Sequence, residues 1–484
     1  MNYRFSIYCL RLLPALAWLI MIPSCKHAGN STSTDSIEKK SQTPPNVIVI
    51  LADDLGYQDV GFNGCNDIPT PAIDRIAHEG VTFTNGYVTY CVCGPSRAGL
   101  ITGRYQDRFG FSRNPLFAPN DPDMGLPLSE ETLANVLGQA NYKSVAIGKW
   151  HLGAHESLHP LKRGFDDFFG FLSGGHFYFP DQWVLNNPFE ATTQGDGYRT
   201  KILRNYQRVT ETEYLTDALS REAVAYIEKY KNQPFFIYLA YNAPHGPLQA
   251  TDNYLERFNH ITDKKRRTYA AMVSAMDDGI GQVLNKLDTL NLSDNTIVFF
   301  LSDNGGPETT NASNNGPLRG KKGDLFEGGI RVPFAMRWPK QIKQGLKFHK
   351  PVSSLDIFST VIAQIPKDLK IKNKLDGVDL LPFVKRDKLE APHDMLFWRK
   401  YDAQEMALVF GDGLKWLNSN KKDFLYDLNI DIGEQNNITL KSDELKKINS
   451  YYNKWYLELS TPKFLGLLQD KEYNKSHSNR FKKP

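Results

Sequence analysis

Residues 47–51 read Val-Ile-Val-Ile-Leu, and the chain continues with Asp53 and Asp54. A short run of consecutive apolar residues predicts a strand that is buried on both faces. Three further apolar runs predict strands at 144–147, 235–239 and 296–301. Each follows a stretch with helical periodicity, near 131–139, 215–230 and 265–287 respectively. We therefore predict an α/β fold with a large, mostly parallel mixed sheet that is flanked by helices.

The region after about Leu380 has a different pattern. Short strand candidates lie at 395–398, 406–410 and 414–417, and Gly411-Asp412-Gly413 fits a hairpin turn between the last two. A helix candidate follows at 442–459. This pattern predicts a main domain over 46–380 and a small C-terminal α+β subdomain with an antiparallel sheet over 381–460. Residues 461–484 are expected to form a basic tail that is poorly ordered after Lys471.

Composition and charge narrow the class of protein. The chain has 484 residues, of which 41% are apolar and 23% charged, and this excludes a disordered or fibrous protein. The formal net charge is +4, and Arg4 and Arg11 supply two of these charges without an acid before residue 25, which leaves +2 for the rest. A body of this size with so little net charge gives no electrostatic reason to expect nucleic-acid binding.

The N-terminus reads as a targeting segment. Arg4 and Arg11 precede an apolar run over 12–23, which is too short to span a bilayer. Residues 1–24 are therefore predicted to be a secretory signal peptide. Ile22-Pro23-Ser24-Cys25 resembles a bacterial lipobox, although Pro23 is an imperfect fit to that pattern.

This N-terminus predicts an exported lipoprotein, in the periplasm or on the outer membrane. Lipid on Cys25 would be its only membrane contact, and the Ser/Thr/Lys-rich residues 25–45 would be a tether. The alternative is ordinary cleavage near Ser24, which leaves Cys25 as a free thiol. Beyond Cys25 the chain has three cysteines, Cys65, Cys91 and Cys93. This is an odd number for an exported protein, and a Cys65–Cys91 disulfide would leave Cys93 alone.

Polar residues follow the ends of the predicted strands, where open parallel sheets form their sites. Asp53 and Asp54 follow the first strand, and Asp303 and Asn304 follow the last. A single Asp after a strand is usually a turn or cap residue. Two such pairs on two strands instead favour a site for Ca²⁺, with Mg²⁺ as the alternative, since carboxylate and amide oxygens are hard ligands.

The other two strands and a glycine-rich segment add cations and histidines. Lys149 and His151 follow the second strand, His245 follows the third, and Lys322 lies in the glycine-rich segment. A lone His is usually structural, but these residues beside a metal are suited to anion binding and proton transfer. Together they predict a pocket for the ester of an oxyanion.

One further motif supplies a nucleophile. Cys93-Gly94-Pro95-Ser96-Arg97, followed by Leu100 and by Thr102-Gly103-Arg104, resembles the C-x-P-S-R motif of the formylglycine-dependent sulfatases. These belong to the alkaline-phosphatase superfamily. Other segments agree with the family in the same order, over about residues 46–459: 52–56, 148–153, 244–245, 302–305, 322, 327–333 and 424–428.

The resemblance implies a mechanism. Cys93 would be oxidised by a maturation enzyme to formylglycine, whose hydrated form is a geminal diol. One diol oxygen would accept the sulfate and the other would later expel it, which a serine cannot do. The resemblance also implies these roles: Asp53, Asp54, Asp303 and Asn304 as calcium ligands, Arg97 and Lys149 stabilising the ionised diol, His151 accepting a proton, and His245 and Lys322 holding the sulfate and protonating the leaving alcohol.

A further pocket candidate is His176. It lies in the aromatic stretch 173–180, after Arg163-Gly164-Phe165, where relatives carry pocket residues. An aromatic loop that stacks on a sugar and an aromatic packing cluster are equally compatible with this stretch.

We therefore expect an enzyme that hydrolyses sulfate esters, on sulfated carbohydrates, with 46–380 as its catalytic domain. One alternative is a phosphoester or phosphonate monoester hydrolase of the same superfamily, and another is a non-catalytic protein that binds sulfated glycans. The intact Cys93 motif and both metal pairs argue against the second.

Overall fold

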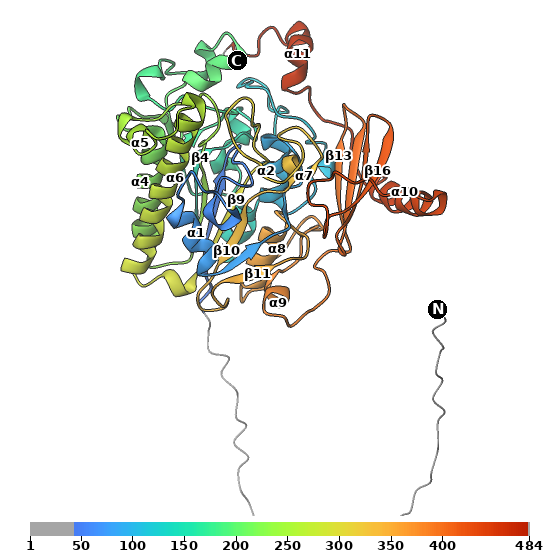
Figure 1. The fold of residues 1–484 in the computed structure, drawn as a ribbon. Coiled ribbons are helices and arrows are strands. Elements are labelled where there is room, and N and C mark those ends of the chain that lie inside the picture. Colours follow the sequence, from blue (N-terminus) through green and yellow to red (C-terminus); the bar gives the residue numbers. More distant parts are fainter. Residues whose placement is uncertain (1–42, 483–484) are drawn as a thin grey trace, which may run out of the picture. The chain divides into compact units, whose positions relative to one another are not determined.

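Residues 43–482 are described by a computed structural model of the chain (Figure 1). The predicted signal peptide, Cys25 and most of the predicted tether lie outside these residues. A ten-stranded sheet forms the centre, in the order β11 (Leu346–Phe348), β2 (Val81–Phe83), β10 (Phe334–Arg337), β9 (Thr296–Ser302), β1 (Asn46–Ala52), β8 (Phe235–Ala240), β4 (Lys143–Lys149), β5 (Asp167–Phe171), β6 (Leu203–Arg204) and β7 (Gln207–Arg208).

The four predicted strands are β1, β4, β8 and β9. They are consecutive in the sheet and parallel to one another, as expected. Antiparallel pairs occur on both sides of them, because β10 runs against β9 and β6 runs against β5. The prediction of a mostly parallel mixed sheet is therefore confirmed.

Helices cover both faces of this sheet, which explains the unbroken apolar run of β1. Val47, Val49 and Leu51 pack into one core, and Ile48 and Ile50 pack into the other. The first core is closed by α2 (Cys93–Thr102), α3 (Leu133–Gly138), α8 (Asp356–Ala363) and α9 (Leu381–Val384). The second is closed by α1 (Pro71–His78), α4 (Leu215–Tyr230) and α6 (Lys264–Thr289) (Figure 1).

The C-terminal region forms a second sheet, as predicted. Its four antiparallel strands are β13 (Met395–Lys400), β14 (Glu405–Phe410), β15 (Leu414–Ser419) and β16 (Lys422–Asp427). One face packs on α10 (Ser442–Tyr456) through Trp416, Tyr452 and Trp455. The other face meets the main body, where the indole N–H of Trp398 donates to the carbonyl oxygen of Val88 at 2.7 Å. The remaining elements are short: β3 (Gly86–Tyr87), β12 (Val352–Ser353), α5 (Asp252–Glu256), α7 (Glu327–Ile330) and α11 (Asp470–Ser476).

The expectation of poor order after Lys471 is wrong for the described residues, 472–482, which include part of the helix α11 and the buried Tyr473. Phe464 and Tyr473 are buried in the core between the tail and the main sheet. The hydroxyl of Tyr473 donates to Asp121 at 2.7 Å, and Arg480 is paired with Asp470. Buried aromatic side chains therefore hold this basic segment on the domain.

The cysteines form no disulfide in the described residues. Cys91 is buried, and Cys65 is half-buried with its thiol donating to Asp67, so the considered Cys65–Cys91 bond is not formed. Between residues 43 and 482, no helix combines the length and apolar character needed to cross a membrane.

Candidate functional site

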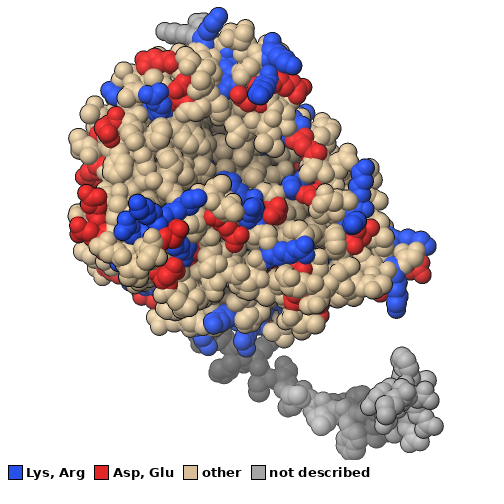
Figure 2. Space-filling model, turned by 45° about the horizontal axis from the view of Figure 1, so that its top comes forward, with Lys and Arg blue, Asp and Glu red and all other residues tan. Residues whose placement is uncertain are grey.

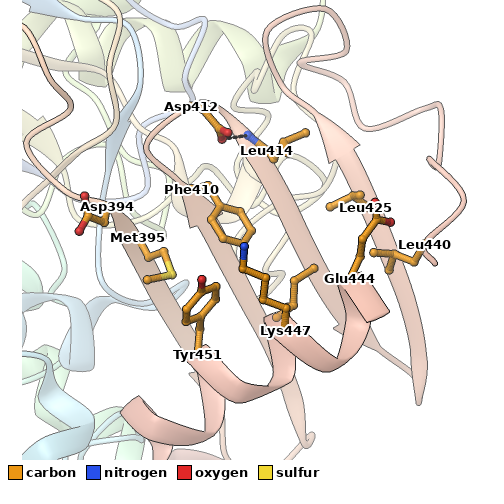
Figure 3. A pocket seen from close by; sticks show the side chains of 11 residues that line it. Asp394, Met395, Phe410, Asp412, Leu414, Leu425, Leu440, Glu444, Lys447 and Tyr451 are labelled. Atoms are coloured by element: carbon orange, nitrogen blue, oxygen red, sulfur yellow. Dashed lines mark hydrogen bonds between the residues drawn. The ribbon is translucent and has the colours of Figure 1, made fainter. Parts of the chain in front are cut away.

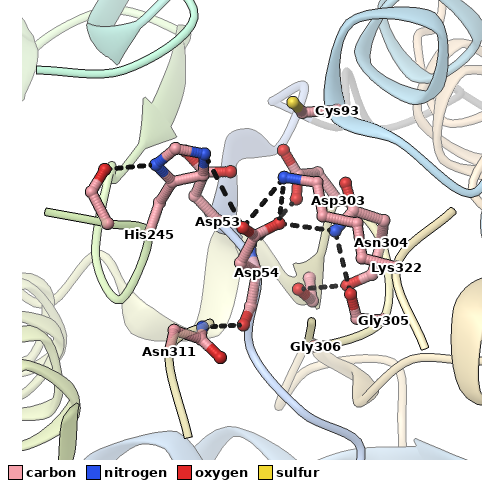
Figure 4. Close-up of polar contacts among 12 residues, drawn as sticks. Asp53, Asp54, Cys93, His245, Asp303, Asn304, Gly305, Gly306, Asn311 and Lys322 are labelled. Carbon is pink, nitrogen blue, oxygen red and sulfur yellow. Dashed lines mark hydrogen bonds and ion pairs between the residues drawn. The ribbon is translucent and has the colours of Figure 1, made fainter. Parts of the chain in front are cut away.

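The carboxyl ends of β1 and β9 meet at one point of the sheet. Ala52 pairs with Ser302, so the residues that follow each strand lie side by side. The backbone N–H of Asp54 donates to Asp303 Oδ1 at 3.3 Å, and the side-chain amide of Asn304 donates to Asp54 Oδ1 at 2.7 Å (Figure 4). The structure thus brings together all four predicted metal ligands, including Asp53, and buries them.

This acidic cluster fits a hard divalent cation. Asp53 Oδ1 and Asn304 Oδ1 are buried oxygen atoms without a hydrogen-bond partner among the described residues. Buried acceptors are normally satisfied, so these two oxygens favour a bound ion. Ligand atoms of Asp53, Asp303 and Cys93 all lie within 4.8 Å of one another, which places the cysteine side chain at the same centre.

Three cations surround the carboxylates, and one of them is Arg97, whose Nε lies 2.8 Å from Asp303 Oδ2. Lys149 Nζ lies 2.6 Å from Asp53 Oδ2, and Lys322 Nζ lies 2.7 Å from Asp54 Oδ1. Burial raises the pKa of Asp53 to about 7, with Asp303 adding to the effect. Burial acts on Asp54 in the same direction, but Lys322 and His245 overcome it and lower the pKa of Asp54 below its usual value.

Helix α2 presents the cysteine and an arginine on one face. Cys93 is its first residue and Arg97 lies one turn later, where side chains at positions i and i+4 are neighbours. Pro95 lies in the first turn, where a missing N–H costs no helical hydrogen bond. Cys93 is only 2% exposed, and burial raises the pKa of its thiol. The unmodified thiol is therefore a poor nucleophile at neutral pH.

Both predicted histidines lie beside the cluster. His245 Nε2 is 3.6 Å from Asp54 Oδ2, while its Nδ1 donates to the carbonyl oxygen of Gly246 at 2.6 Å. Burial lowers the pKa of His245 to about 3. Burial and the nearby Lys149 also lower the pKa of His151, whose Nδ1 has no partner among the described residues. Both rings are neutral and able to accept a proton.

His176 does not fit its predicted role as a pocket residue. It is buried against Phe171 and Trp183, and its two ring nitrogens contact the carbonyl oxygens of Phe177 and Thr200 at 2.9 and 2.7 Å. No ring nitrogen remains for a substrate, so the aromatic stretch is a packing cluster at this position.

The loop before His176 does approach the site. A Cβ atom on Gly174 would lie 2.6 Å from His151 Nε2, and one on Gly175 would lie 2.6 Å from the hydroxyl oxygen of Tyr198. The two glycines therefore let the backbone pass closely between His151 and Tyr198. Tyr198 is a site residue that the sequence did not indicate.

Asn114 is a second missed residue. Its Oδ1 accepts a hydrogen bond from the backbone N–H of Gly94 at 2.8 Å and lies 3.8 Å from Cys93 Sγ. It belongs to no strand end and no motif, so only the folded structure reveals it.

The surface carries a hollow and, in the C-terminal subdomain, a cavity. The face drawn in Figure 2 carries a hollow with basic side chains on its rim and mixes Lys and Arg with Asp and Glu elsewhere. A cavity of about 570 Å³ lies apart from the predicted site residues, in the C-terminal subdomain (Figure 3). Its walls come from β13–β16, α10 and the neighbouring loops, and include Phe410, Lys447 and Tyr451.

Comparison with known proteins agrees with this geometry. The sulfatase family profile matches residues 45–366. The uncharacterized sulfatase YdeN of Escherichia coli is 30% identical over 477 residues, which cover 86% of this chain and 80% of that protein. Human N-acetylgalactosamine-6-sulfatase is 35% identical over 359 residues, which cover 72% of this chain and 67% of that enzyme.

Solved structures extend the similarity to most of the fold. The crystal structure of Ps i-CgsB has a TM-score of 0.83 and 38% identity, and the match covers 91% of this chain and 99% of that one. The same protein has been solved in complex with k-i-k-neocarrahexaose. A phosphonate monoester hydrolase of Agrobacterium radiobacter has a TM-score of 0.61 at 20% identity, which shows a shared fold alone.

Proposed function

Because the chain belongs to the sulfatase family, we propose that it hydrolyses sulfate esters of carbohydrates through a formylglycine made from Cys93. A divalent cation, Ca²⁺ or alternatively Mg²⁺, would be held by Asp53, Asp54, Asp303 and Asn304. The observation that carries this proposal is the position of Cys93. Its sulfur shares a 4.8 Å cluster with carboxylate oxygens of Asp53 and Asp303, in a site with unpartnered buried oxygens.

The converted side chain supplies two hydroxyls on one carbon, so that one oxygen can carry the sulfate while the other remains available to expel it. The bound cation supplies positive charge next to the reacting oxygens. The chain itself supplies the remaining groups. Arg97 and Lys149 place positive charge beside position 93, and His151, neutral and buried, accepts the proton of the remaining hydroxyl.

Two further residues, His245 and Lys322, are proposed to act on the leaving alcohol. His245 and Lys322 both lie within 3.6 Å of Asp54, so they face the same region of the site. Lys322 holds an anionic oxygen, because burial would lower the pKa of its ammonium but Asp54 raises it well above the usual value. His245 and Lys322 are the candidates for protonating the alcohol, His245 once the anionic ester in the site favours its protonated form.

Sulfated carbohydrates are the proposed substrate class. The human relative is named for sulfated N-acetylgalactosamine, and Ps i-CgsB has been solved with a carrageenan hexasaccharide. The proposed cellular context is export to the periplasm or outer membrane, with removal of 1–24 and lipid on Cys25. Since Cys93, Pro95 and Ser96 are buried in the fold, a formylglycine-generating maturase would need to act before folding is complete.

A desulfation screen tests the proposal. The protein, co-expressed with a maturase, is incubated with defined sulfated mono- and oligosaccharides and with the matching phosphate esters, and released sulfate and phosphate are measured. We expect sulfate release that is absent in Cys93→Ala. Faster release of phosphate or phosphonate would favour the alternative hydrolase, and glycan binding without release would favour a non-catalytic binding protein.

A further inference from the structure

We propose that a second cavity, next to Cys93, binds the sugar unit adjacent to the sulfated one, so that the enzyme recognises an oligosaccharide and not a single sugar. This inference rests on the proposed function, and it adds the substrate length. The cavity has a volume of about 340 Å³. Its walls include Tyr90, Val92, Arg113, Asn114, Lys400 and Asp402.

The cavity adjoins the reacting centre on two sides. Asn114 lines it and lies 3.8 Å from Cys93 Sγ. Gly323 also lines it and directly follows Lys322, and its N–H donates to the carbonyl oxygen of Cys91 at 2.8 Å. A sugar whose sulfate lies between Cys93 and Lys322 therefore has its neighbouring unit at this cavity.

The polar groups of the cavity suit sugar hydroxyls. Arg113 donates two hydrogen bonds to Asp402, from Nε at 2.9 Å and from Nη2 at 2.6 Å. Each oxygen of Asp402 thus keeps a free lone pair, and its side chain is 39% exposed. The side-chain N–H₂ of Asn114 donates to no described residue. A fixed acceptor pair and a free donor match neighbouring hydroxyls of a pyranose ring.

The C-terminal tail adds apolar side chains to the cavity wall. Leu467 and Leu468 are 45% and 90% exposed, which is unusual for adjacent leucines on a folded segment. The tail is held in place because Leu467 N–H donates to the Asn114 carbonyl oxygen at 3.0 Å and Arg113 donates to the Phe464 carbonyl oxygen at 2.9 Å. Sugar rings have one apolar C–H face, which an exposed apolar wall can cover.

Enzyme kinetics on matched substrates test this proposal. N-acetylgalactosamine 6-sulfate and galactose 4-sulfate are each supplied as the free monosaccharide and as the terminal unit of a tetrasaccharide. In Asp402→Ala, and separately in Leu468→Asp, we expect kcat/KM on the tetrasaccharide to fall about tenfold, mainly through KM, because one good hydrogen bond or apolar contact is worth roughly that factor. The monosaccharide rate is expected to stay unchanged.

Lys447→Ala, in the distant cavity of Figure 3, is the control variant. It should leave kcat/KM unchanged on both the monosaccharide and the tetrasaccharide. Equal losses on both substrates, or no loss on the tetrasaccharide, would overturn the role of the cavity. A wild-type enzyme that releases no sulfate from any sugar would contradict the proposed function itself. In that case the role of the cavity is tested separately, by calorimetric measurement of the affinity of wild type and Asp402→Ala for the same tetrasaccharides. Equal affinities would refute the proposal that the cavity binds a sugar unit.

Discussion

Arg97 and Asp303 form a fully buried ion pair, in which Arg97 Nε donates to Asp303 Oδ2 at 2.8 Å. Burial would lower the pKa of the Arg97 guanidinium, but Asp303 and Asp53 raise it, so the arginine stays charged. The cluster holds three carboxylates and three cations: Asp53, Asp54, Asp303, Arg97, Lys149 and Lys322. These charges balance, so a divalent cation would leave a surplus of two positive charges for a sulfate ester.

The metal site gives the first prediction. Asp303→Ala is expected to lose both bound metal and sulfatase activity, because the variant removes a ligand and leaves Arg97 without its buried partner. Elemental analysis should find one hard divalent cation per wild-type chain and none in the variant. Asp412→Ala, an exposed Asp in the C-terminal hairpin, should keep both. Two zinc ions per chain would instead favour the phosphatase alternative.

The two histidines give the second prediction. If His245 protonates the leaving alcohol, His245→Ala should slow sugar-sulfate hydrolysis by about 10²–10⁴-fold more than 4-nitrophenyl sulfate hydrolysis, because a phenolate needs little protonation. His151→Ala should slow both substrates equally, since it acts after the alcohol has left. Rates of both variants on both substrates measure this. Equal losses for His245→Ala would assign the acid role to another group.

The third prediction concerns an ion-pair network between the C-terminal sheet and the main body and its contribution to the stability of the fold. Lys415 Nζ lies 2.9 Å from Glu327 Oε1 and 2.8 Å from Glu434 Oε1, and all three side chains are buried. Lys415→Met should lower the free energy of unfolding by about 3 kcal/mol, because it leaves the buried Glu434 without a cation and Glu327 with only Arg331, at 3.3 Å. Adding Glu434→Gln should recover part of the loss. Urea unfolding measures both, and an unchanged midpoint for Lys415→Met would contradict this role.

The fourth prediction is a pH dependence of stability. His393 Nε2 lies 2.8 Å from Asp356 Oδ1. Burial would lower the pKa of His393, but Asp356 raises it above the usual value. A raised histidine pKa stabilises the fold fully below the unfolded value of about 6.5, and this stabilisation is lost as the pH rises through the folded value.

The melting temperature should therefore decrease above about pH 6.5 more steeply in wild type than in His393→Gln. Thermal unfolding at a series of pH values measures the difference between the two proteins. Parallel curves would mean that the His393–Asp356 pair contributes no pH-dependent stability.

The central strands could be predicted because each is a continuous apolar run that is buried on both faces. β6 and β7 have only two residues each and no such pattern, so they are defined by the pairing of β6 with β5 and of β7 with β6. The tail was mispredicted for a related reason. Tyr473 is buried by a contact with Asp121, which is distant in the sequence, and the local sequence pattern gives no indication of this burial.

The grouping of the acidic residues, lysines and histidines at one end of the sheet could be predicted, because these residues follow strand ends or lie in family motifs. Asn114 and Tyr198 have neither signal. Asn114 reaches the site from a loop and Tyr198 from the short 3-10 helix Gln194–Arg199, and tertiary packing sets the position of both. His176 shows the opposite error. Its segment does approach the site, but Gly174 and Gly175 make that approach and the histidine turns into the aromatic core.

The state of residue 93 tests the central claim most directly. Mass spectrometry of the peptide that contains this position, from protein with measured sulfatase activity, should show a mass about 18 Da below that of the cysteine peptide, as conversion of a thiol to an aldehyde requires. Cys93→Ala should be inactive, and Cys93→Ser should turn over slowly at most and retain a sulfated serine. Full activity in protein whose Cys93 is entirely unmodified would contradict the account.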